Sequence, residues 1–193
     1  MNESGSAQLY IALIHHPVLN KKGDVICSAI TNLDLHDIAR AAQTFGVKRY
    51  YVVNPLTDQV VLADKIVHHW TEGKGGQVNP ARRKALSLIR ITSSLDDVIE
   101  DIVLESGQPV KVIATSARQE SSTICFSDLK KDLACGDSVL LLFGTAWGLA
   151  EEIMDKAHGV LEPVMGNGEY NHLSVRSAVS IILDRVMSSR GRL

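Results

Sequence analysis

The order of the apolar segments constrains the fold of this chain more than any other feature. Short aliphatic and aromatic runs, each long enough for a buried strand, alternate with longer segments whose apolar residues recur every three or four positions. Parallel strands need crossover connections, which are usually helices that cover the faces of the sheet. The alternation therefore predicts an α/β protein with a mainly parallel sheet flanked by helices on both faces.

Individual elements can be placed from this pattern. The expected strands lie at residues 9–14, 50–53, 87–92, 110–114, 139–143 and 160–164. The expected helices lie at residues 34–45, 60–70, 95–104, 126–133, 149–156 and 174–187. Asp34 and Ser174 are the expected N-caps of the first and last helices. The polar, glycine-bearing stretch 73–80 is predicted to be a loop.

Length and composition narrow the class of protein. The 193 residues are 45% hydrophobic and 22% charged, without an internal repeat, low-complexity tract or linker, so residues 1–193 are predicted to form a single domain. No apolar run approaches the roughly 20 residues of a membrane span, and the first seven residues lack the pattern of a secretory signal. The three cysteines are widely separated and form no CxxC pair. We therefore expect a cytoplasmic protein with neither a membrane segment nor a metal site.

The charge balance gives no general indication of nucleic-acid binding. The formal net charge is -2, whereas attraction to phosphates usually leaves a basic excess. Any RNA site must therefore be a local patch, for which the candidates are residues 21–22, 48–49 and 82–84. Each of these clusters is equally compatible with an ordinary solvated surface.

Three segments that follow expected strands are candidates for ligand binding. Residues 114–118, 143–149 and 164–174 are rich in glycine and small residues, which let main-chain groups approach a ligand closely. Ligands of open α/β sheets bind beyond the carboxyl ends of the strands. The sequence contains neither a Gly-x-Gly-x-x-Gly motif after its first strand nor a lysine-bearing phosphate loop. These segments favour a nucleotide-like ligand held without a phosphate cradle, although the glycines are also typical of plain tight turns.

The same segments carry a resemblance to a known family. The run Asn-His-Leu-Ser-Val-Arg-Ser-Ala at 171–178 resembles the last motif of SPOUT methyltransferases. Residues 141–149, with Phe-Gly followed by small residues and a second glycine, resemble the middle motif, and residues 35–42 with 45–47 resemble the first. The resemblance covers essentially the whole chain. It is to a small bacterial group similar to a domain found fused to tRNA guanine-N1 methyltransferase.

The resemblance implies methyl transfer from S-adenosylmethionine (SAM) to RNA, either tRNA or rRNA and either base or ribose, by a homodimer of the SPOUT fold. It also implies a C-terminal deep trefoil knot, which rests on the resemblance alone because general topology rules treat knots as essentially absent. The cofactor pocket implied by the family comprises Thr115, Ser116, Phe143, Gly144, Thr145, Gly148, Val164, Met165, Asn171, His172, Leu173 and Ser174.

Arg40, Asp34 and Arg176 are the residues that the resemblance implies for catalysis. Arg40 falls where many family members carry an arginine facing the methyl acceptor, although it could instead pair with Asp34 or Asp37 on the helix surface. Asp34 stands where ribose-modifying members usually have Asn, which disfavours ribose methylation and leaves base methylation open. Arg176 is a candidate to support the acceptor across a dimer interface. His15 follows the first strand and is a candidate substrate contact.

Two other functions fit parts of the sequence. A SPOUT-like module that binds SAM or RNA without transferring a methyl group would agree with the acidic balance and the missing Asn. An unrelated α/β hydrolase is disfavoured because no Gly-x-Ser-x-Gly elbow is present.

Overall fold

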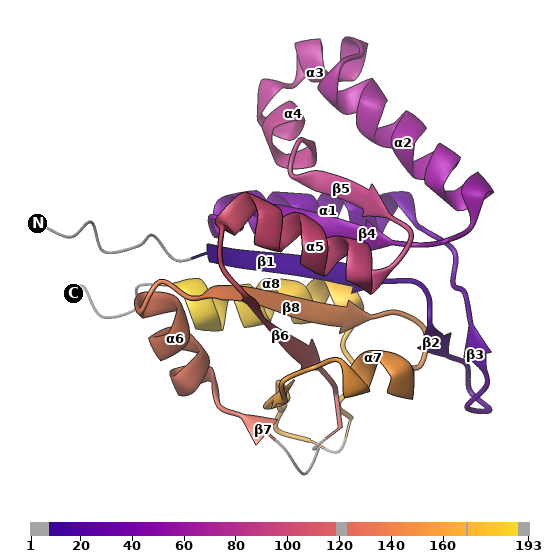
Figure 1. Cartoon of the computed structure of the whole chain (residues 1–193). Coiled ribbons are helices and arrows are strands. Elements are labelled where there is room, and N and C mark those ends of the chain that lie inside the picture. The colour runs from indigo at the N-terminus through magenta and orange to yellow at the C-terminus, as the bar shows by residue number, and fades with distance from the viewer. Residues whose placement is uncertain (1–7, 119–122, 169, 189–193) are drawn as a thin grey trace, which may run out of the picture.

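The sheet is parallel throughout. The computed structural model describes residues 8–118, 123–168 and 170–188, and its main sheet has seven strands in the order β5-β4-β1-β8-β6-β9-β7 (Figure 1). The strands are β1 (Gln8–Ile14), β4 (Arg49–Val53), β5 (Ile89–Thr92), β6 (Val110–Thr115), β7 (Thr123–Ile124), β8 (Ser138–Gly144) and β9 (Val160–Leu161). Each neighbouring pair is parallel. A separate antiparallel hairpin joins β2 (Val18–Leu19) to β3 (Val25–Ile26).

Helices cover both faces of the sheet, as predicted. The helices are α1 (Asn32–Thr44), α2 (Thr57–Thr71), α3 (Lys74–Val78), α4 (Pro80–Leu86), α5 (Leu95–Ser106), α6 (Phe126–Ala134), α7 (Glu151–Asp155) and α8 (Val175–Met187). One core cluster joins the sheet to α1, α2, α4, α6 and α8. The other joins the opposite face to α5 and α7.

The long apolar run at 139–143 forms the central strand of the sheet, which explains its composition. Strand β8 pairs with β1 on one side and β6 on the other, and its residues from Ser138 to Phe143 are all buried. Val139, Leu141 and Phe143 contribute to the α1 and α8 face, while Leu140 and Leu142 face α5 and α7. A central parallel strand needs apolar side chains on both faces, so it reads as continuous rather than alternating.

A hydroxyl side chain caps both the first and the last helix. Asp34 was expected to cap α1, but Thr31 is the N-cap and its hydroxyl accepts from the Asp34 amide at 3.2 Å. Asp34 lies in the first turn, where its negative charge suits the helix dipole. Ser174 caps α8 by accepting from the Ser177 amide, as predicted.

The prediction of a loop at 73–80 is wrong, because this segment contains α3 and the start of α4. Asn79 caps α4 by accepting from the Arg82 amide, and Pro80 occupies the first turn, where its missing N–H costs nothing. Gly75 and Gly76 are buried in α3, and a Cβ on Gly75 would lie 2.7 Å from His69 Nε2. The glycines therefore allow tight packing on the end of α2 rather than marking a loop.

Strand lengths also differ from expectation. The last strand ends at Leu161 rather than at residue 164, and the two-residue strands β2, β3 and β7 were not foreseen. Strands this short carry no detectable periodicity, so only their pairing defines them. None of the helices in the described ranges has the length and apolarity to cross a membrane.

Leu141→Ala should lower the free energy of unfolding by about 3 kcal/mol, because it opens a cavity at the centre of the sheet. Leu141 is fully buried, whereas Leu104 on α5 is 84% exposed and provides the control. Urea unfolding checks both variants, and Leu104→Ala should stay within about 0.5 kcal/mol of the wild type. Equal losses in the two variants would contradict the assigned core.

Candidate functional site

Three loops leave the sheet side by side at its carboxyl edge. Strands β6, β8 and β9 are parallel neighbours, with Ala114 opposite Leu142 and Thr115 opposite Leu161. The segments that follow these strands are the three that the sequence singled out. The fold therefore places segments far apart in the chain at one edge, where ligands of open α/β sheets bind.

Direct contacts join the first loop to β8, just before the middle loop begins, and to the third loop. The Thr115 hydroxyl donates to the Leu142 carbonyl at 2.8 Å, which ties the end of β6 to β8. The Asn171 amide group donates to the Ala117 carbonyl at 3.4 Å and lies 3.6 Å from the Met165 sulfur. One cluster of loops thus contains three of the residues implied for the cofactor pocket, namely Thr115, Met165 and Asn171.

The middle loop uses its main-chain donors within the protein. The Thr145 amide donates to Ile14, the Trp147 amide to Leu19 and the Gly148 amide to Thr145. A Cβ on Gly144 would lie 2.9 Å from the Leu149 nitrogen, and Gly148 has a φ of +113°, so both positions require glycine. Phe143 is buried in the core. These residues define the shape of the loop.

The third loop is different, because its main chain is uncommitted. In the described part of the chain, the main-chain groups of residues 164–168 and 170–173 form no hydrogen bond with another backbone group. Met165, Tyr170 and Leu173 expose apolar side chains beside them, and the Tyr170 and His172 rings meet edge to face at 5.4 Å. Free donors and acceptors beside apolar side chains suit a ligand with a flat, polar-edged ring.

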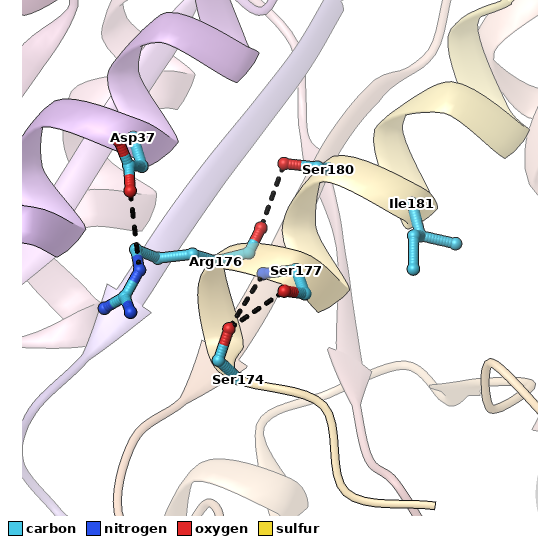
Figure 2. A pocket seen from close by; sticks show the side chains of 6 residues that line it. All are labelled: Asp37, Ser174, Arg176, Ser177, Ser180 and Ile181. Atoms are coloured by element: carbon cyan, nitrogen blue, oxygen red, sulfur yellow. Dashed lines mark hydrogen bonds and ion pairs between the residues drawn. The ribbon is translucent and has the colours of Figure 1, made fainter.

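An ion pair between a buried carboxylate and a half-buried arginine connects the starts of α1 and α8. Asp34 is 5% exposed; its Oδ1 accepts from Arg176 Nη1 at 2.7 Å and its Oδ2 from the Thr31 hydroxyl at 2.6 Å. Arg176 Nε also lies 3.5 Å from Asp37 Oδ2 (Figure 2). The structure therefore brings two of the three implied catalytic residues into contact.

Arg40 stands apart from this pair. Its side chain is exposed one turn beyond Asp37 on α1, and it forms no ion pair with the residues that the structure describes. The alternative in which Arg40 pairs with Asp34 or Asp37 is wrong, because both carboxylates form ion pairs with Arg176 instead. The Arg40 guanidinium is thus available to a ligand.

An open pocket lies where α1 and α8 meet. It is lined by Asp37, Ser174, Arg176, Ser177, Ser180 and Ile181 (Figure 2). Two of these residues, Ser174 and Arg176, were implied by the sequence resemblance, and the other four were not among the implied site residues. Their signal was the spacing of small residues along α8, which by itself is equally typical of close helix packing.

A polar chain runs beneath the middle loop. His15 is fully buried, and its Nδ1 lies 3.0 Å from Ser28 Oγ, which in turn lies 2.5 Å from Thr145 Oγ1. Its Nε2 has no described hydrogen-bond partner. Burial lowers the pKa of His15 to about 4, with the nearby Asp34 charge opposing this effect. Ser28, which connects His15 to Thr145, belongs to no motif and could not be identified from the sequence.

No group of three or more His, Cys, Asp or Glu side chains gathers in metal-binding geometry within the described ranges.

A parallel sheet with helices on both faces and three loops meeting at its carboxyl edge defines an α/β ligand-binding protein. The model of one family, described as SAM-dependent RNA methyltransferase, matches residues 8–188. The chain belongs to this family.

Two relatives show how the chain compares with longer proteins. It is 45% identical over 185 residues to a tRNA (guanine-N(1)-)-methyltransferase of Oleidesulfovibrio alaskensis, covering 96% of this chain and 43% of that protein. It is 39% identical over 181 residues to an uncharacterized protein of Aquifex aeolicus, covering 93% of this chain and 88% of that protein. The chain thus spans less than half the length of the first relative.

The fold has solved counterparts. The SpoU methyltransferase AviRb of Streptomyces viridochromogenes, crystallised in complex with AdoMet, is similar with a TM-score of 0.58. The two chains are 16% identical, and the match covers 94% of this chain and 60% of that one. At this identity the likeness supports the fold, and the predicted SPOUT-type architecture agrees with it.

His15→Asn should weaken the acid sensitivity of folding. The folded pKa of His15 is about 4 against an ordinary 6.5, so between these values the unfolded chain binds a proton that the folded chain does not. This group's contribution is complete above pH 6.5 and is lost as the pH falls toward 4, amounting to about 2 kcal/mol by pH 5. Urea unfolding at about pH 7.5 and pH 5 measures the difference. Parallel losses in wild type and variant would show that His15 has no such role.

Proposed function

We propose that this protein transfers a methyl group from SAM to RNA in the cytoplasm, and that tRNA is the first substrate to test. The observation that carries the proposal is the meeting of three motif-bearing loops at one edge, in a chain that matches the methyltransferase family over residues 8–188. The relative named as a tRNA (guanine-N(1)-)-methyltransferase supports tRNA as the acceptor.

The residues present fit SAM. The uncommitted main chain of residues 164–168 and 170–173 would hold the adenine ring, together with the side chains of Val164, Met165, Asn171, His172 and Leu173. Thr115 and Ser116 would complete the pocket from the first loop. Bound SAM supplies an activated methyl group on a sulfonium, so the protein's own task is alignment and exclusion of water.

Four of the implied pocket residues would act by shaping it. Phe143, Gly144, Thr145 and Gly148 are buried, tightly packed or hydrogen bonded within the protein. Ser174 caps α8, which fixes where the third loop ends. We assign these residues to the geometry of the pocket rather than to direct recognition.

Arg40 is the residue proposed to face the methyl acceptor. Its free, exposed guanidinium can bind a phosphate or orient a base. Asp34 and Arg176 would position Arg40 by joining α1 to α8. Both Asp34 oxygens already accept hydrogen bonds, and a carboxylate has no amide to donate, so the role of the Asn found in ribose-modifying enzymes is unfilled. We therefore propose that the acceptor is a base.

A knotted C-terminal segment in a single domain of residues 1–193 belongs to the same proposal. Strand β9 lies between β6 and β7, although β6 and β7 are consecutive in that part of the chain. In a knot, the chain that follows β9 would pass the segment that follows β6 at the carboxyl edge. The contact from Asn171 to Ala117, just after β6, supports such a passage.

A homodimer is proposed through the open surface of α1 and α8. Ser177 and Ser180 are small and exposed, and Ile181 is half-buried beside them (Figure 2). Small residues allow close approach of a second helix, and the implied pocket residue Ser174 lies at the start of the same surface. A partner bound there would lie beside both the third loop and Arg176.

Arg40→Ala should reduce methyl transfer from tritiated SAM to tRNA about 100-fold, the usual loss for one oriented charged or polar group at a reacting centre. SAM affinity, measured by isothermal titration, should change less than about twofold because Arg40 lies outside the three loops. Lys130→Ala, on the exposed side of α6, is the control and should transfer normally. Tight SAM binding without transfer to any RNA by the wild type would favour a binding-only module.

Ser177→Arg with Ser180→Arg should convert the dimer to a monomer, because two bulky charges would face each other across the proposed interface. Sedimentation equilibrium measures the mass of the wild type and of each variant in solution. Ser127→Arg on α6 is also an exposed helical serine and should leave the dimer intact. A monomeric wild type, or a dimer that persists in the double variant, would refute this interface.

A further inference from the structure

Positive charge is concentrated in one lobe of an otherwise acidic chain. Residues 57–90, from α2 to β5, contain six lysines and arginines against three acids, a formal charge of +3. The whole chain carries -2, so the remaining residues sum to -5. Figure 1 shows α2, α3 and α4 stacked together beyond β5, at one end of the molecule. The overall balance therefore conceals a local basic surface.

Among the residues that the structure describes, the cations of this lobe form no ion pair. Arg49, Lys111, Lys131, Lys156 and Arg176 form the ion pairs in the described ranges, and all five lie outside the lobe. Arg82, Arg83 and Lys84 follow one another on α4, and none of them meets a described carboxylate. Adjacent like charges without counter-charges repel one another and attract a polyanion.

The lobe is continuous with Arg40. Helices α1 and α4 pack against each other, and His36 of α1 meets the Trp70 ring edge to face at 5.3 Å. Burial lowers the pKa of His36, and the positive charges of Arg82 and Arg40 lower it further, whereas Asp37 opposes them. The geometry agrees with these effects, because Arg82 lies over the Trp70 ring that His36 contacts, and Arg40 follows His36 by about one helical turn on α1. Arg40, Arg82, Arg83 and Lys84 form one surface, here called the basic strip.

Local packing holds the strip in place. The Arg82 guanidinium lies 4.8 Å from the centre of the Trp70 ring, a cation–π distance. The His69 ring also meets the Trp70 ring edge to face, with the two ring centres 5.2 Å apart. With Arg82 fixed on Trp70, the exposed Arg83 and Lys84 project from a capped helix rather than from a loop. A rigid presentation lowers the entropy lost when the side chains bind.

We propose that the basic strip binds the phosphate backbone of the RNA and guides it to Arg40. This rests on the proposed function, since it names the surface by which that site holds its substrate. Arginine and lysine contacts to phosphates supply affinity and orientation, while the loops and Arg40 select the acceptor. An acidic protein is the competing partner, and the strip's start at Arg40, on the helix of the family's first motif, favours RNA.

The test measures RNA binding by the full chain, and it does not depend on methyl transfer. Fluorescence anisotropy with a labelled tRNA transcript compares wild type, Arg83→Gln with Lys84→Gln, and a control, Lys130→Gln with Lys131→Gln on α6. Glutamine keeps the side-chain length and helix propensity, and the control removes the same charge. The Arg83/Lys84 variant should bind about tenfold more weakly, and its salt dependence should lose roughly 1.5 from the slope of log K against log salt. The control should stay within about twofold.

Several results would overturn the inference. They are equal effects in the variant and the control, a wild type without salt-dependent RNA affinity, and competition by polyglutamate as effective as by RNA. Unchanged SAM affinity in the variant shows that its fold and loops are intact. Failure of the proposed function can be distinguished from failure of this inference. It would appear as RNA binding through the basic strip with no methyl transfer by the wild type.

Discussion

The parallel direction of all seven strands is the constraint from which the candidate site follows. Because neighbouring strands run the same way, β6, β8 and β9 end at one edge, and the segments after Thr115, Gly144 and Leu161 begin side by side. The constraint depends in turn on the central position of β8, whose side chains are buried on both faces. A sheet of mixed direction would have separated these loops by the length of a strand.

Within that edge, hydrogen-bond commitments divide the loops by role. The middle loop donates its amides to β1, β2 and itself, so it behaves as a fixed wall. In the third loop, the described residues 164–168 and 170–173 form no backbone–backbone hydrogen bond, and Met165 and Leu173 are exposed. The Asp34–Arg176 pair then sets α1, and hence Arg40, relative to that loop. A buried ion pair is weak evidence for stability, but its loss would leave a charge without a partner, which is costly.

Charge segregation reconciles an acidic chain with an RNA-directed family. The net charge of -2 averages a basic lobe over a more acidic remainder. Binding of a polyanion depends on the local field within about a Debye length rather than on the total charge. A negative net charge therefore does not exclude RNA binding by a surface whose cations are clustered and, in the described ranges, form no ion pairs.

The sequence by itself determined the α/β class, the main strands, the family and the three loop motifs, because hydrophobic periodicity and motif spacing are local properties of the chain. It did not reveal α3, because its glycines allow close packing on α2 that only the folded neighbours define. The partners of Asp34 could not be predicted either. Thr31 is the cap in its place, and the ion pair of Asp34 is with Arg176, 142 residues away, rather than with Arg40, which was the alternative considered. Only the tertiary structure decided these points, since pairing between distant side chains depends on how the sheet and helices bring them together.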